Sequence, residues 1–367
     1  MVGLMITKDF LSANVESTLK VVLKESSLHI KLVLVCVIVA LSLFTTWSIL
    51  VIQKFYKFDY LQSYKELSFS NDSQIPLFVK TIKNHTIFFE ANIPKDTSFF
   101  LMETSGKSRL TLKELCALES AARLHPKRKA FFLMTNKTYE RSAAVLEIME
   151  KYSNIQLLSI DLTYVFKGTV IENLWLKNRI QNSAHYNSHM SDILRCWFLY
   201  NYGGTYLDTD VIVLKELPLN YSYAGVENME SFLITGSVIH FTHHHKLLKM
   251  ILTDISHNFD GVAWINNGPA MFTNNIIKLC KANTMKTIND AKCHNFKLLP
   301  PNAFFPVYYP SWQLYFDSGS REEIKKRLKD SLIAHYWGKL SSKTKIKSGM
   351  PIHDLALEKC PLTAKYF

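Results

Sequence analysis

Two carboxylates one residue apart are the feature of this 367-residue chain whose spacing most directly suggests chemistry. Asp208 and Asp210 follow the glycine pair Gly203-Gly204 and a short apolar stretch, and they lead into the apolar run 211–214. Paired carboxylates bind hard divalent cations such as Mg²⁺ and Mn²⁺, which commonly also take oxygens from a substrate phosphate. An Asp-x-Asp pair alone is common in turns, so the neighbouring segments decide what this pair does.

The segment before the acid pair predicts a helix that brings two more charged residues to it. Ser191 is an N-cap type residue, and apolar residues follow at helical spacing up to Gly203, which suits a helix end. The helix advances about 15 Å from Asp192, and a strand returning from Gly203 covers about 16 Å, so the acid pair comes back beside the start of the helix. Asp192 and Arg195 share one helix face there. They either complete a phosphate- and sugar-binding cluster or form a surface ion pair.

The sequence before this helix alternates strands and helices. Apolar runs predict strands at 97–102, 130–134 and 155–160, with a helix opened by the capping box Thr111–Glu114 and a second helix at 139–152. This order predicts a parallel sheet, whose ligands bind beyond the carboxyl ends of the strands. Glu103-Thr104-Ser105 follows the first strand at such an end, and it is either part of a nucleotide site or a simple turn.

The N-terminal part predicts a membrane anchor. Residues 32–52 carry no charge and are long enough for a helix of about 31 Å, which matches the hydrocarbon core, with a buried helix as the alternative. We expect a short cytoplasmic tail at 1–31, the anchor at 32–52, a stem at 53–85 and one large domain at 86–367. Lysines flank the run in similar number on both sides and do not orient it. Four Asn-x-Ser/Thr sequons all follow it, which favours a lumenal domain: Asn71, Asn84, Asn136 and Asn220.

The cysteines indicate disulfides rather than a zinc site. Cys36 lies in the apolar run, and the other five show no Cys-x-x-Cys spacing. An oxidising lumen therefore predicts one or two disulfides with one thiol left over. Cys280 and Cys293 enclose a short polar loop and are the first expected pair.

The net charge of +12 suits an anionic ligand or a lipid surface, although most of it is scattered. The dense run 321–329 interleaves acids and bases at helical spacing and predicts a solvated helix face. A lumenal protein is not expected to bind nucleic acid. His243-His244-His245 is expected to be a solvated turn before a helix at Lys246, because adjacent imidazoles cannot all face one metal ion.

The motifs around the acid pair resemble a known enzyme family. Ser-Asp-x-x-Arg at 191–195 and Gly-Gly-Thr-Tyr-Leu-Asp-Thr-Asp at 203–210 are similar to the metal-dependent nucleotide-sugar glycosyltransferases of family 32, most of all to the α-1,4-galactosyltransferases of globo-series glycolipids. Further segments agree in the expected order across residues 97–367: Glu103-Thr104-Ser105, Cys116, 119–126, Gly268-Pro269, 300–306 and Ala334-His335-Tyr336-Trp337.

The resemblance implies an α/β fold of the GT-A type with a mostly parallel central sheet, a UDP-sugar donor, Mn²⁺ or Mg²⁺ as cofactor, and retention of anomeric configuration. It implies that Asp208, Asp210 and His335 hold the metal and that Asp192 and Arg195 contact the donor sugar and phosphates. The four acidic and basic residues 192, 195, 208 and 210 are its implied catalytic residues. Asp208 is also an implied donor contact, at the ribose. The other implied donor contacts are Glu103, Thr104, Ser105, Tyr206, Asn267, Gly268 and Trp337.

His335 and Trp337 are expected to share a strand face, where the indole would cover the base or the sugar. An imidazole is an acceptable Mn²⁺ ligand, although a lone histidine on an apolar strand is more often structural. No residue stands out as a nucleophile. We therefore expect same-face attack, in which the departing phosphate accepts the proton of the acceptor.

We expect a single-pass Golgi enzyme that transfers a sugar in α-1,4 linkage to a galactose-type terminus of a glycosphingolipid or other glycan. The segment Trp264–Pro269 departs from the pattern of vertebrate members of the family, with asparagines in place of a bulkier polar pair. The sugar therefore stays open between galactose and an N-acetylhexosamine. The alternatives are a GDP-mannose transferase of similar fold and an inactive membrane-anchored sugar-binding protein.

Overall fold

The computed structural model describes residues 77–82, 85–90, 92–230, 232–290 and 293–367. The chain divides into two compact units, Met1–Asp72 and Ser73–Phe367, and every described residue belongs to the second unit. The predicted tail, membrane anchor and most of the stem therefore lie outside the described residues. Within the described ranges, no helix is both long and apolar enough to span a membrane.

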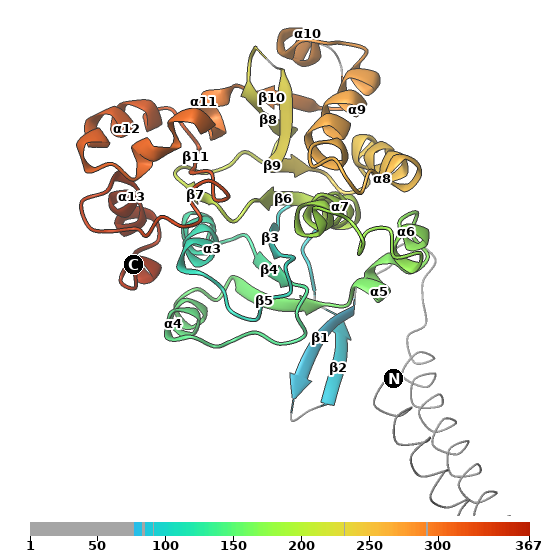
Figure 1. The fold of residues 1–367 in the computed structure, drawn as a ribbon, viewed down its shortest axis with the longest axis horizontal. Helices are drawn as coiled ribbons and strands as arrows, with labels where there is room; N and C mark the ends of the chain where they lie inside the picture. The colour runs from blue at the N-terminus through green and yellow to red at the C-terminus, as the bar shows by residue number, and fades with distance from the viewer. Residues whose placement is uncertain (1–76, 83–84, 91, 231, 291–292) are drawn as a thin grey trace, which may run out of the picture. The chain divides into compact units, whose positions relative to one another are not determined.

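A nine-stranded sheet forms the centre of the described unit (Figure 1). Its strands are β1 Leu77–Ile82, β2 His85–Glu90, β3 Phe99–Glu103, β4 Ala130–Met134, β5 Ile155–Ile160, β6 Gly204–Leu207, β8 Ser222–Asn228, β9 Leu233–Phe241 and β10 Phe296–Leu299. They lie in the order β10-β8-β9-β6-β3-β4-β5-β1-β2. The central strands β6, β3, β4 and β5 run parallel, as predicted, and antiparallel pairs flank them at β9 and β1. A separate two-stranded sheet pairs β7 Val211–Val213 with β11 Ile333–His335.

Helices cover both faces of the central sheet (Figure 1). They are α3 Leu112–Leu124, α4 Ala143–Lys151, α5 Leu162–Phe166, α6 Glu172–Leu176, α7 Tyr186–Tyr202, α8 Lys246–Asn258, α9 Met271–Cys280, α10 Met285–Asp290, α11 Pro301–Phe304, α12 Arg321–Leu328, α13 Pro351–Lys359 and α14 Pro361–Ala364. Phe100 and Met102 of β3 pack into a core with α7 and α8, whereas Phe99 and Leu101 pack into a core with α3 and α4. Alternate residues of a strand buried on both faces produce this division.

Local signals predict the helices of the first half well. Thr111 caps α3, because its hydroxyl accepts a hydrogen bond from the Glu114 N–H and the Glu114 carboxylate accepts one from the Thr111 N–H at 2.7 Å. The predicted capping box is therefore confirmed. α4 begins at Ala143, later than predicted, because the Ser142 hydroxyl accepts from the Val145 N–H and caps the helix there.

The hairpin of β1 and β2 begins before residue 85, where the predicted stem ends. β1 pairs antiparallel with β5, with Phe78 opposite Ile160 and Val79 opposite Ser159. Residues 77–82 therefore belong to the sheet rather than to a stem. Backbone pairing with a distant strand orders this segment, whose sequence shows no clear period.

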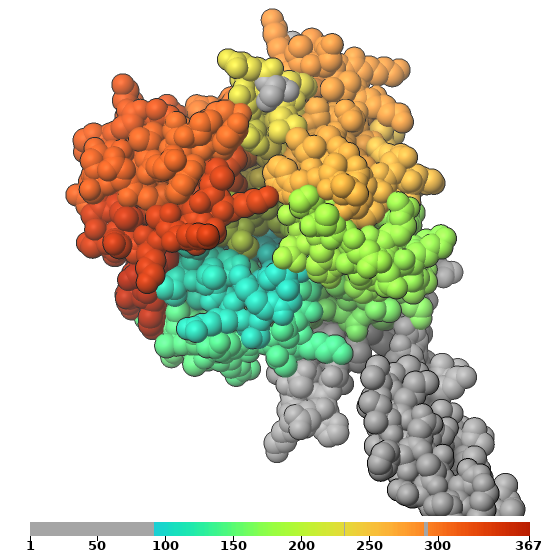
Figure 2. All heavy atoms as spheres, in the orientation of Figure 1, coloured from blue at the N-terminus to red at the C-terminus, as the bar shows by residue number. Residues whose placement is uncertain are grey.

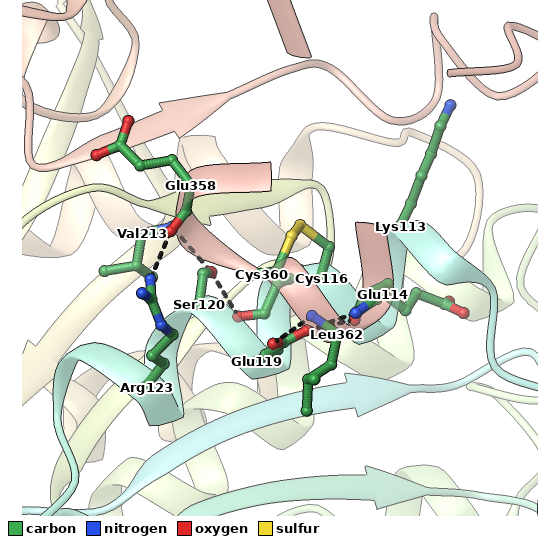
Figure 3. Close-up of a disulfide and its surroundings, with 12 residues drawn as sticks. Lys113, Glu114, Cys116, Glu119, Ser120, Arg123, Val213, Glu358, Cys360 and Leu362 are labelled. Carbon is green, nitrogen blue, oxygen red and sulfur yellow. Dashed lines mark hydrogen bonds between the residues drawn. A yellow bond between two sulfur atoms is a disulfide. The ribbon is translucent and has the colours of Figure 1, made fainter. Parts of the chain in front are cut away.

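Two disulfides join parts of the described unit. Cys280–Cys293 links residues 13 positions apart and confirms the predicted pair. Cys116–Cys360 links residues 244 positions apart and holds the end of α13 against α3 (Figure 3). Cys196 in α7 is the free, buried thiol among the described cysteines.

Candidate active site

The acid pair lies at the carboxyl edge of the central sheet. Parallel pairing of β6 with β3 places Tyr206 opposite Phe100, so Asp208 leaves the sheet at the edge where β3 ends. The Asp208 N–H donates to the Ser237 carbonyl at 2.7 Å, which continues the β6–β9 pairing past the end of β6. Backbone hydrogen bonds thus hold Asp208 in position.

The surface is hollowed where the segments around the acid pair meet (Figure 2). Red atoms from the C-terminal part of the chain face cyan atoms from around residues 100–130 and green atoms from around residues 170–190. Yellow-green atoms, the colour of the segment that includes the acid pair, lie recessed between them. Asp208 and Asp210 are only half buried, which fits a position accessible from this hollow.

The glycine pair before β6 is required by close backbone contacts. Gly203 and Gly204 both have positive φ angles, +64° and +100°. A Cβ on Gly203 would lie 2.1 Å from Asp96 Oδ1, and one on Gly204 would lie 2.3 Å from the Ser98 carbonyl oxygen. Only glycine fits these two positions, so the sharp reversal from α7 into β6 depends on them.

α7 begins at Tyr186, before its predicted start at Ser191, so Ser191 is not a helix cap. Its hydroxyl accepts from Arg195 Nη2 at 3.0 Å and donates to the Tyr206 hydroxyl at 2.9 Å. The Tyr206 hydroxyl in turn donates to Asp208 Oδ1 at 2.7 Å. Burial raises the pKa of Tyr206 well above its usual value, so the phenol stays protonated and acts as a donor. Tyr206, predicted as a donor contact, therefore positions Asp208.

Arg195 is shared between two carboxylates. Its Nη2 lies 3.3 Å from Asp192 Oδ1 and 3.5 Å from Asp208 Oδ1. The guanidinium also lies over the Tyr206 ring, 4.4 Å from its centroid, and a Cβ on Gly236 would lie only 2.9 Å from Nη1. Arg195 and Asp192 are both buried, so the surface ion pair is excluded. Burial raises the pKa of Asp192 to about 6, although Arg195 opposes this rise.

The β7–β11 sheet brings His335 to the acid pair. β7 follows Asp210 directly, and its antiparallel pairing with β11 places His335 opposite Val211. His335 Nε2 lies 3.3 Å from Asp210 Oδ1. One ligand atom from each of Asp208, Asp210 and His335 lies within 4.8 Å of the other two, and this is the single such group in the described part of the chain. Two carboxylates and an imidazole form a donor set that fits Mn²⁺.

The surroundings of Asp210 favour its charged form, which can bind a cation. Burial alone would raise the pKa of Asp210, but the His335 imidazole and the Gly338 N–H, which donates to Oδ2 at 2.5 Å, outweigh burial and lower it. Burial would likewise lower the pKa of His335, but Asp210, with a smaller contribution from Asp208, raises it. Asp210 is therefore held in the ionised form that a metal ligand needs.

Trp337 lies beside His335 but not on the same strand face, so that prediction is wrong. β11 ends at His335, and Trp337 has a left-handed φ of +56°. The two rings are nevertheless 4.6 Å apart, and Trp337 Nε1 donates to the Val307 carbonyl at 2.8 Å. Phe305 and Tyr309 also pack near the indole. The turn after β11, rather than strand alternation, places this aromatic group at the site.

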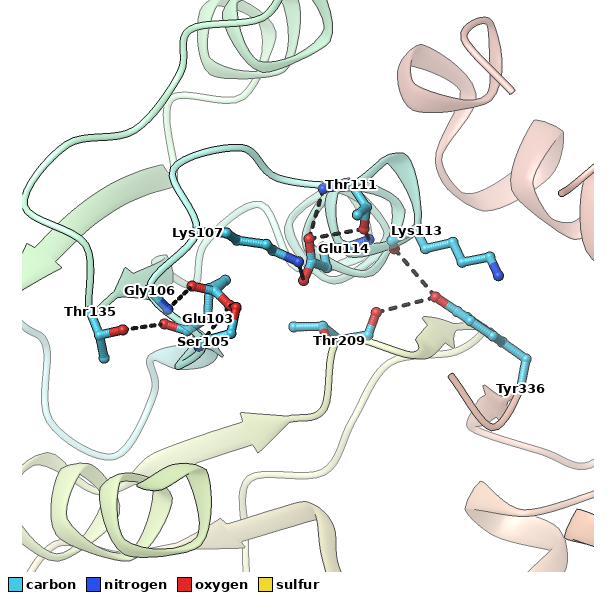
Figure 4. A network of polar contacts seen from close by, with 10 residues as sticks. All are labelled: Glu103, Ser105, Gly106, Lys107, Thr111, Lys113, Glu114, Thr135, Thr209 and Tyr336. Atoms are coloured by element: carbon cyan, nitrogen blue, oxygen red, sulfur yellow. Dashed lines mark hydrogen bonds and ion pairs between the residues drawn. The ribbon is translucent and has the colours of Figure 1, made fainter. Parts of the chain in front are cut away.

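The segment after β3 forms a turn whose carboxylate points into itself (Figure 4). Glu103 accepts hydrogen bonds from the Ser105 N–H at 2.8 Å, the Ser105 hydroxyl and the Gly106 N–H at 3.1 Å. The Thr104 hydroxyl donates to the Asn187 carbonyl at 2.7 Å. These contacts use the Glu103 carboxylate and the Thr104 hydroxyl within the protein, so the simple-turn alternative accounts for both side chains.

Tyr336 fastens the acid pair to α3 (Figure 4). Its hydroxyl lies 3.2 Å from the Thr209 carbonyl oxygen and 3.4 Å from the Lys113 carbonyl oxygen. Thr209 stands between the two acids, so this contact fixes the turn that presents them.

Gly268 lies against Asp192, and the residue before it closes its own loop. A Cβ on Gly268 would lie 2.7 Å from Asp192 Oδ2. The buried Asn267 amide accepts from the Asp260 N–H at 2.9 Å and donates to the Asp260 carbonyl at 2.5 Å. Asn267, an implied donor contact, therefore shapes the loop through its amide.

Glu227 is a site residue that sequence reasoning missed. The β8–β9 register shifts between Val226 and Asn228, so Glu227 lies in a β-bulge. Bulges re-aim side chains and are common beside active sites. Burial raises the pKa of Glu227 and the His335 imidazole opposes this rise, so the two groups interact electrostatically. The available signal was a glutamate directly after the largely apolar stretch 223–226.

The histidine run forms a turn before α8, as predicted, but it is not fully solvated. His243 Nδ1 lies 2.9 Å from Asp96 Oδ2. His245 is buried, and its Nδ1 accepts from the Leu247 N–H at the start of α8. The run therefore caps the start of α8 and contacts the Asp96 carboxylate.

Comparisons with known proteins show which enzymes the chain resembles. A family model described as the α-1,4-glycosyltransferase conserved region matches residues 240–367, and one described as the glycosyltransferase sugar-binding region containing the DXD motif matches residues 111–229. The chain is similar to the α-1,4-glycosyltransferases. It is a hexosyltransferase, and its acid pair lies in one matched region while His335 lies in the other.

Named relatives of this hexosyltransferase carry two activities. Lactosylceramide 4-alpha-galactosyltransferase of Rattus norvegicus is 28% identical over 272 residues, 72% of this chain and 74% of that protein. Alpha-1,4-N-acetylglucosaminyltransferase of Homo sapiens is 25% identical over 289 residues, 75% of this chain and 82% of that protein. The solved structure of galactosyltransferase LgtC, with donor and acceptor sugar analogues, is 12% identical at a TM-score of 0.41, over 73% of this chain and 95% of that one. That superposition is too loose to carry an argument.

Proposed function

We propose that this hexosyltransferase is an α-1,4-glycosyltransferase that moves galactose or an N-acetylhexosamine from a UDP-sugar, with retention, to a galactose-type terminus of a glycosphingolipid. The observation that carries the proposal is the group of Asp208, Asp210 and His335, whose ligand atoms lie within 4.8 Å of one another. The named relatives, a lactosylceramide galactosyltransferase and an N-acetylglucosaminyltransferase, support this range of donors and acceptors.

A divalent cation held by these three residues, Mn²⁺ or Mg²⁺, would supply charge neutralisation at the donor diphosphate. Arg195 is a fixed, buried guanidinium beside that group, and it can stabilise the departing phosphate as negative charge develops. Its position is set by Ser191, Asp192 and Tyr206 rather than by the substrate. The site is therefore preorganised for a leaving phosphate.

In this proposal Asp192 accepts hydrogen bonds from hydroxyls of the donor sugar, because Arg195 holds its carboxylate beside Asp208. On the proposed same-face route, the acceptor hydroxyl attacks the anomeric carbon while its proton passes to the departing phosphate oxygen. This route needs no protein nucleophile.

The direct test uses the full-length protein in detergent with octyl β-lactoside as acceptor and UDP-galactose, UDP-N-acetylgalactosamine or UDP-N-acetylglucosamine as donor. We expect product with one donor in the presence of Mn²⁺, and a fall of about a hundredfold or more in EDTA. Adding Mn²⁺ back should restore the rate. Equal product with and without EDTA would contradict the proposed metal role.

We further propose that the enzyme is a single-pass Golgi membrane protein with a lumenal catalytic domain. The uncharged run at residues 32–52 and the two disulfides support this placement, because disulfides persist in oxidising compartments. Asn220 is exposed, whereas the Asn136 amide donates to the Gly106 carbonyl at 2.7 Å.

Asn220→Gln is therefore expected to remove one glycan, seen as a smaller glycosidase-dependent shift on a gel. Asn136→Gln serves as the matched control and is expected to leave the shift unchanged. A wild-type protein that glycosidase does not shift would contradict a lumenal domain.

A further inference from the structure

The loop that precedes Gly268 presents an exposed indole on a rigid frame. Trp264 is 47% exposed. Asp260 closes the loop beneath it, because its carboxylate accepts from the Val262 N–H at 2.8 Å, the Ala263 N–H at 3.0 Å and the Asn266 amide at 2.6 Å. The loop that carries this exposed aromatic side chain is thus tied together by hydrogen bonds to Asp260.

Two further contacts fix the indole itself. Its Nε1 donates to the Ser188 hydroxyl of α7 at 3.3 Å. The Lys339 ammonium lies over the ring, 5.1 Å from its centroid, which is a cation–π distance. Nearly half of the residue stays exposed with both contacts in place.

The Trp264 loop and the Lys339 segment also contact the acids of the active site. Gly268, four residues after Trp264, packs on the Asp192 carboxylate. Gly338, which precedes Lys339, donates its N–H to Asp210. The indole therefore stands on the rim of the site, where the segments that hold Asp192 and Asp210 meet above the acid cluster.

We propose that Trp264 is the stacking platform for the terminal sugar of the acceptor. This inference rests on the proposed sugar transfer and adds the residue that recognises the acceptor. A pyranose ring presents a face of C–H groups, and such a face packs on an aromatic ring. A platform that is already rigid loses little conformational entropy when the sugar binds.

Exposure next to the catalytic acids is what separates this role from a structural one. A tryptophan kept for packing would be buried, as Trp197 of α7 is in the core. Val262 on the same loop is 78% exposed but has no aromatic face. Substitution of Val262 therefore tests the loop without testing the platform.

The experiment compares Trp264→Ala, Trp264→Phe and Val262→Ala in the full-length protein. Initial rates are measured with octyl β-lactoside as acceptor, and hydrolysis of the donor by water is measured without acceptor. Trp264→Ala is expected to raise the acceptor KM about tenfold or more, with the donor KM and the hydrolysis rate unchanged. Trp264→Phe should recover most of the loss, and Val262→Ala should match the wild type.

The outcomes separate this inference from the proposed function. Wild-type donor hydrolysis with an unchanged acceptor KM in Trp264→Ala would overturn the platform and leave the sugar transfer intact. A rise in donor KM or a loss of hydrolysis in Trp264→Ala would also overturn it, because the indole would then serve the donor or the fold. A wild-type protein that neither hydrolyses nor transfers any of the three UDP-sugars would overturn the proposed function itself.

Discussion

The Asp210→Asn variant is expected to lose metal-stimulated transfer, with kcat lowered by about a thousandfold. Asp210 contacts His335, accepts the Gly338 N–H and contributes an oxygen to the metal-type group. The amide keeps the shape of the side chain but removes its charge, so the cation loses a ligand that it needs. Asp208 alone, already neighboured by the Arg195 guanidinium, is not expected to hold the cation.

Metal binding gives a readout that does not depend on turnover. Mn²⁺ should raise the Tm of the wild type, because a ligand at about 100 times its Kd adds roughly 2.7 kcal/mol of stability. Asp210→Asn should abolish this rise. Asp354→Asn removes only an exposed ion pair with Arg321 and should keep both the rise and the activity. An Asp210→Asn enzyme that Mn²⁺ still stabilises and stimulates would show that the cation binds elsewhere.

The part of the site nearest the acid pair could be predicted from sequence because it is local. Asp192 and Arg195 lie within twenty residues of Asp210, and the rise of one helix and one strand returns them to it. The predicted helix start was wrong, but the predicted position of Asp192 and Arg195 beside the acid pair is correct. Residues at i and i+3 share a face anywhere in a helix, so the start at Tyr186 leaves the pair facing Asp208.

The rest of the site depends on contacts between distant segments, which residue types alone do not encode. Only the resemblance to a family assigned His335 to the metal, because the β7–β11 pairing joins segments more than a hundred residues apart. Glu227 lies in a β-bulge. The alternating pattern of a regular strand does not predict the direction of a side chain in a bulge. Asn267 was an implied donor contact, but in the fold its amide accepts from the Asp260 N–H and donates to the Asp260 carbonyl.

Ser191 illustrates the same limit at a single side chain. A serine before an apolar helical pattern is a good N-cap, and its type alone favours that reading. In the structure its hydroxyl instead links Arg195 to Tyr206. Tertiary packing thus determines what the Ser191 hydroxyl binds. The hydrogen bonds run from Arg195 through Ser191 and Tyr206 to Asp208.

Removal of the Cys116–Cys360 disulfide is the substitution expected to lower stability most. Because the bridged residues are 244 positions apart, the cross-link strongly restricts the unfolded chain. The Cys116→Ser/Cys360→Ser double variant should lower the free energy of unfolding by about 2–5 kcal/mol, measured by denaturant unfolding. The Glu119 carboxylate still accepts from the Leu362 N–H and the Thr363 N–H, so α14 keeps its contact with α3 and the variant is expected to fold (Figure 3).

The same double variant should weaken the metal site before it unfolds. Cys116 and Cys360 share one apolar core with Ile212 of β7, and the Ser120 hydroxyl of α3 accepts from the Val213 N–H at 3.0 Å. β7 pairs with β11, the strand that carries His335. Looser packing beneath β7 should therefore reduce the Mn²⁺-induced rise in Tm.

The second disulfide provides the matched control, because Cys280–Cys293 closes a loop of only 13 positions between α9 and β10. The Cys280→Ser/Cys293→Ser variant is expected to lose about 3 kcal/mol or less and to keep the full Mn²⁺ response. If both double variants kept that response equally, the disulfide between α3 and α13 would stabilise the chain without supporting the metal site. A smaller Mn²⁺-induced rise in Tm in the Cys116/Cys360 variant alone would instead show that this cross-link supports the metal site. Only this disulfide shares a core with Ile212 of β7.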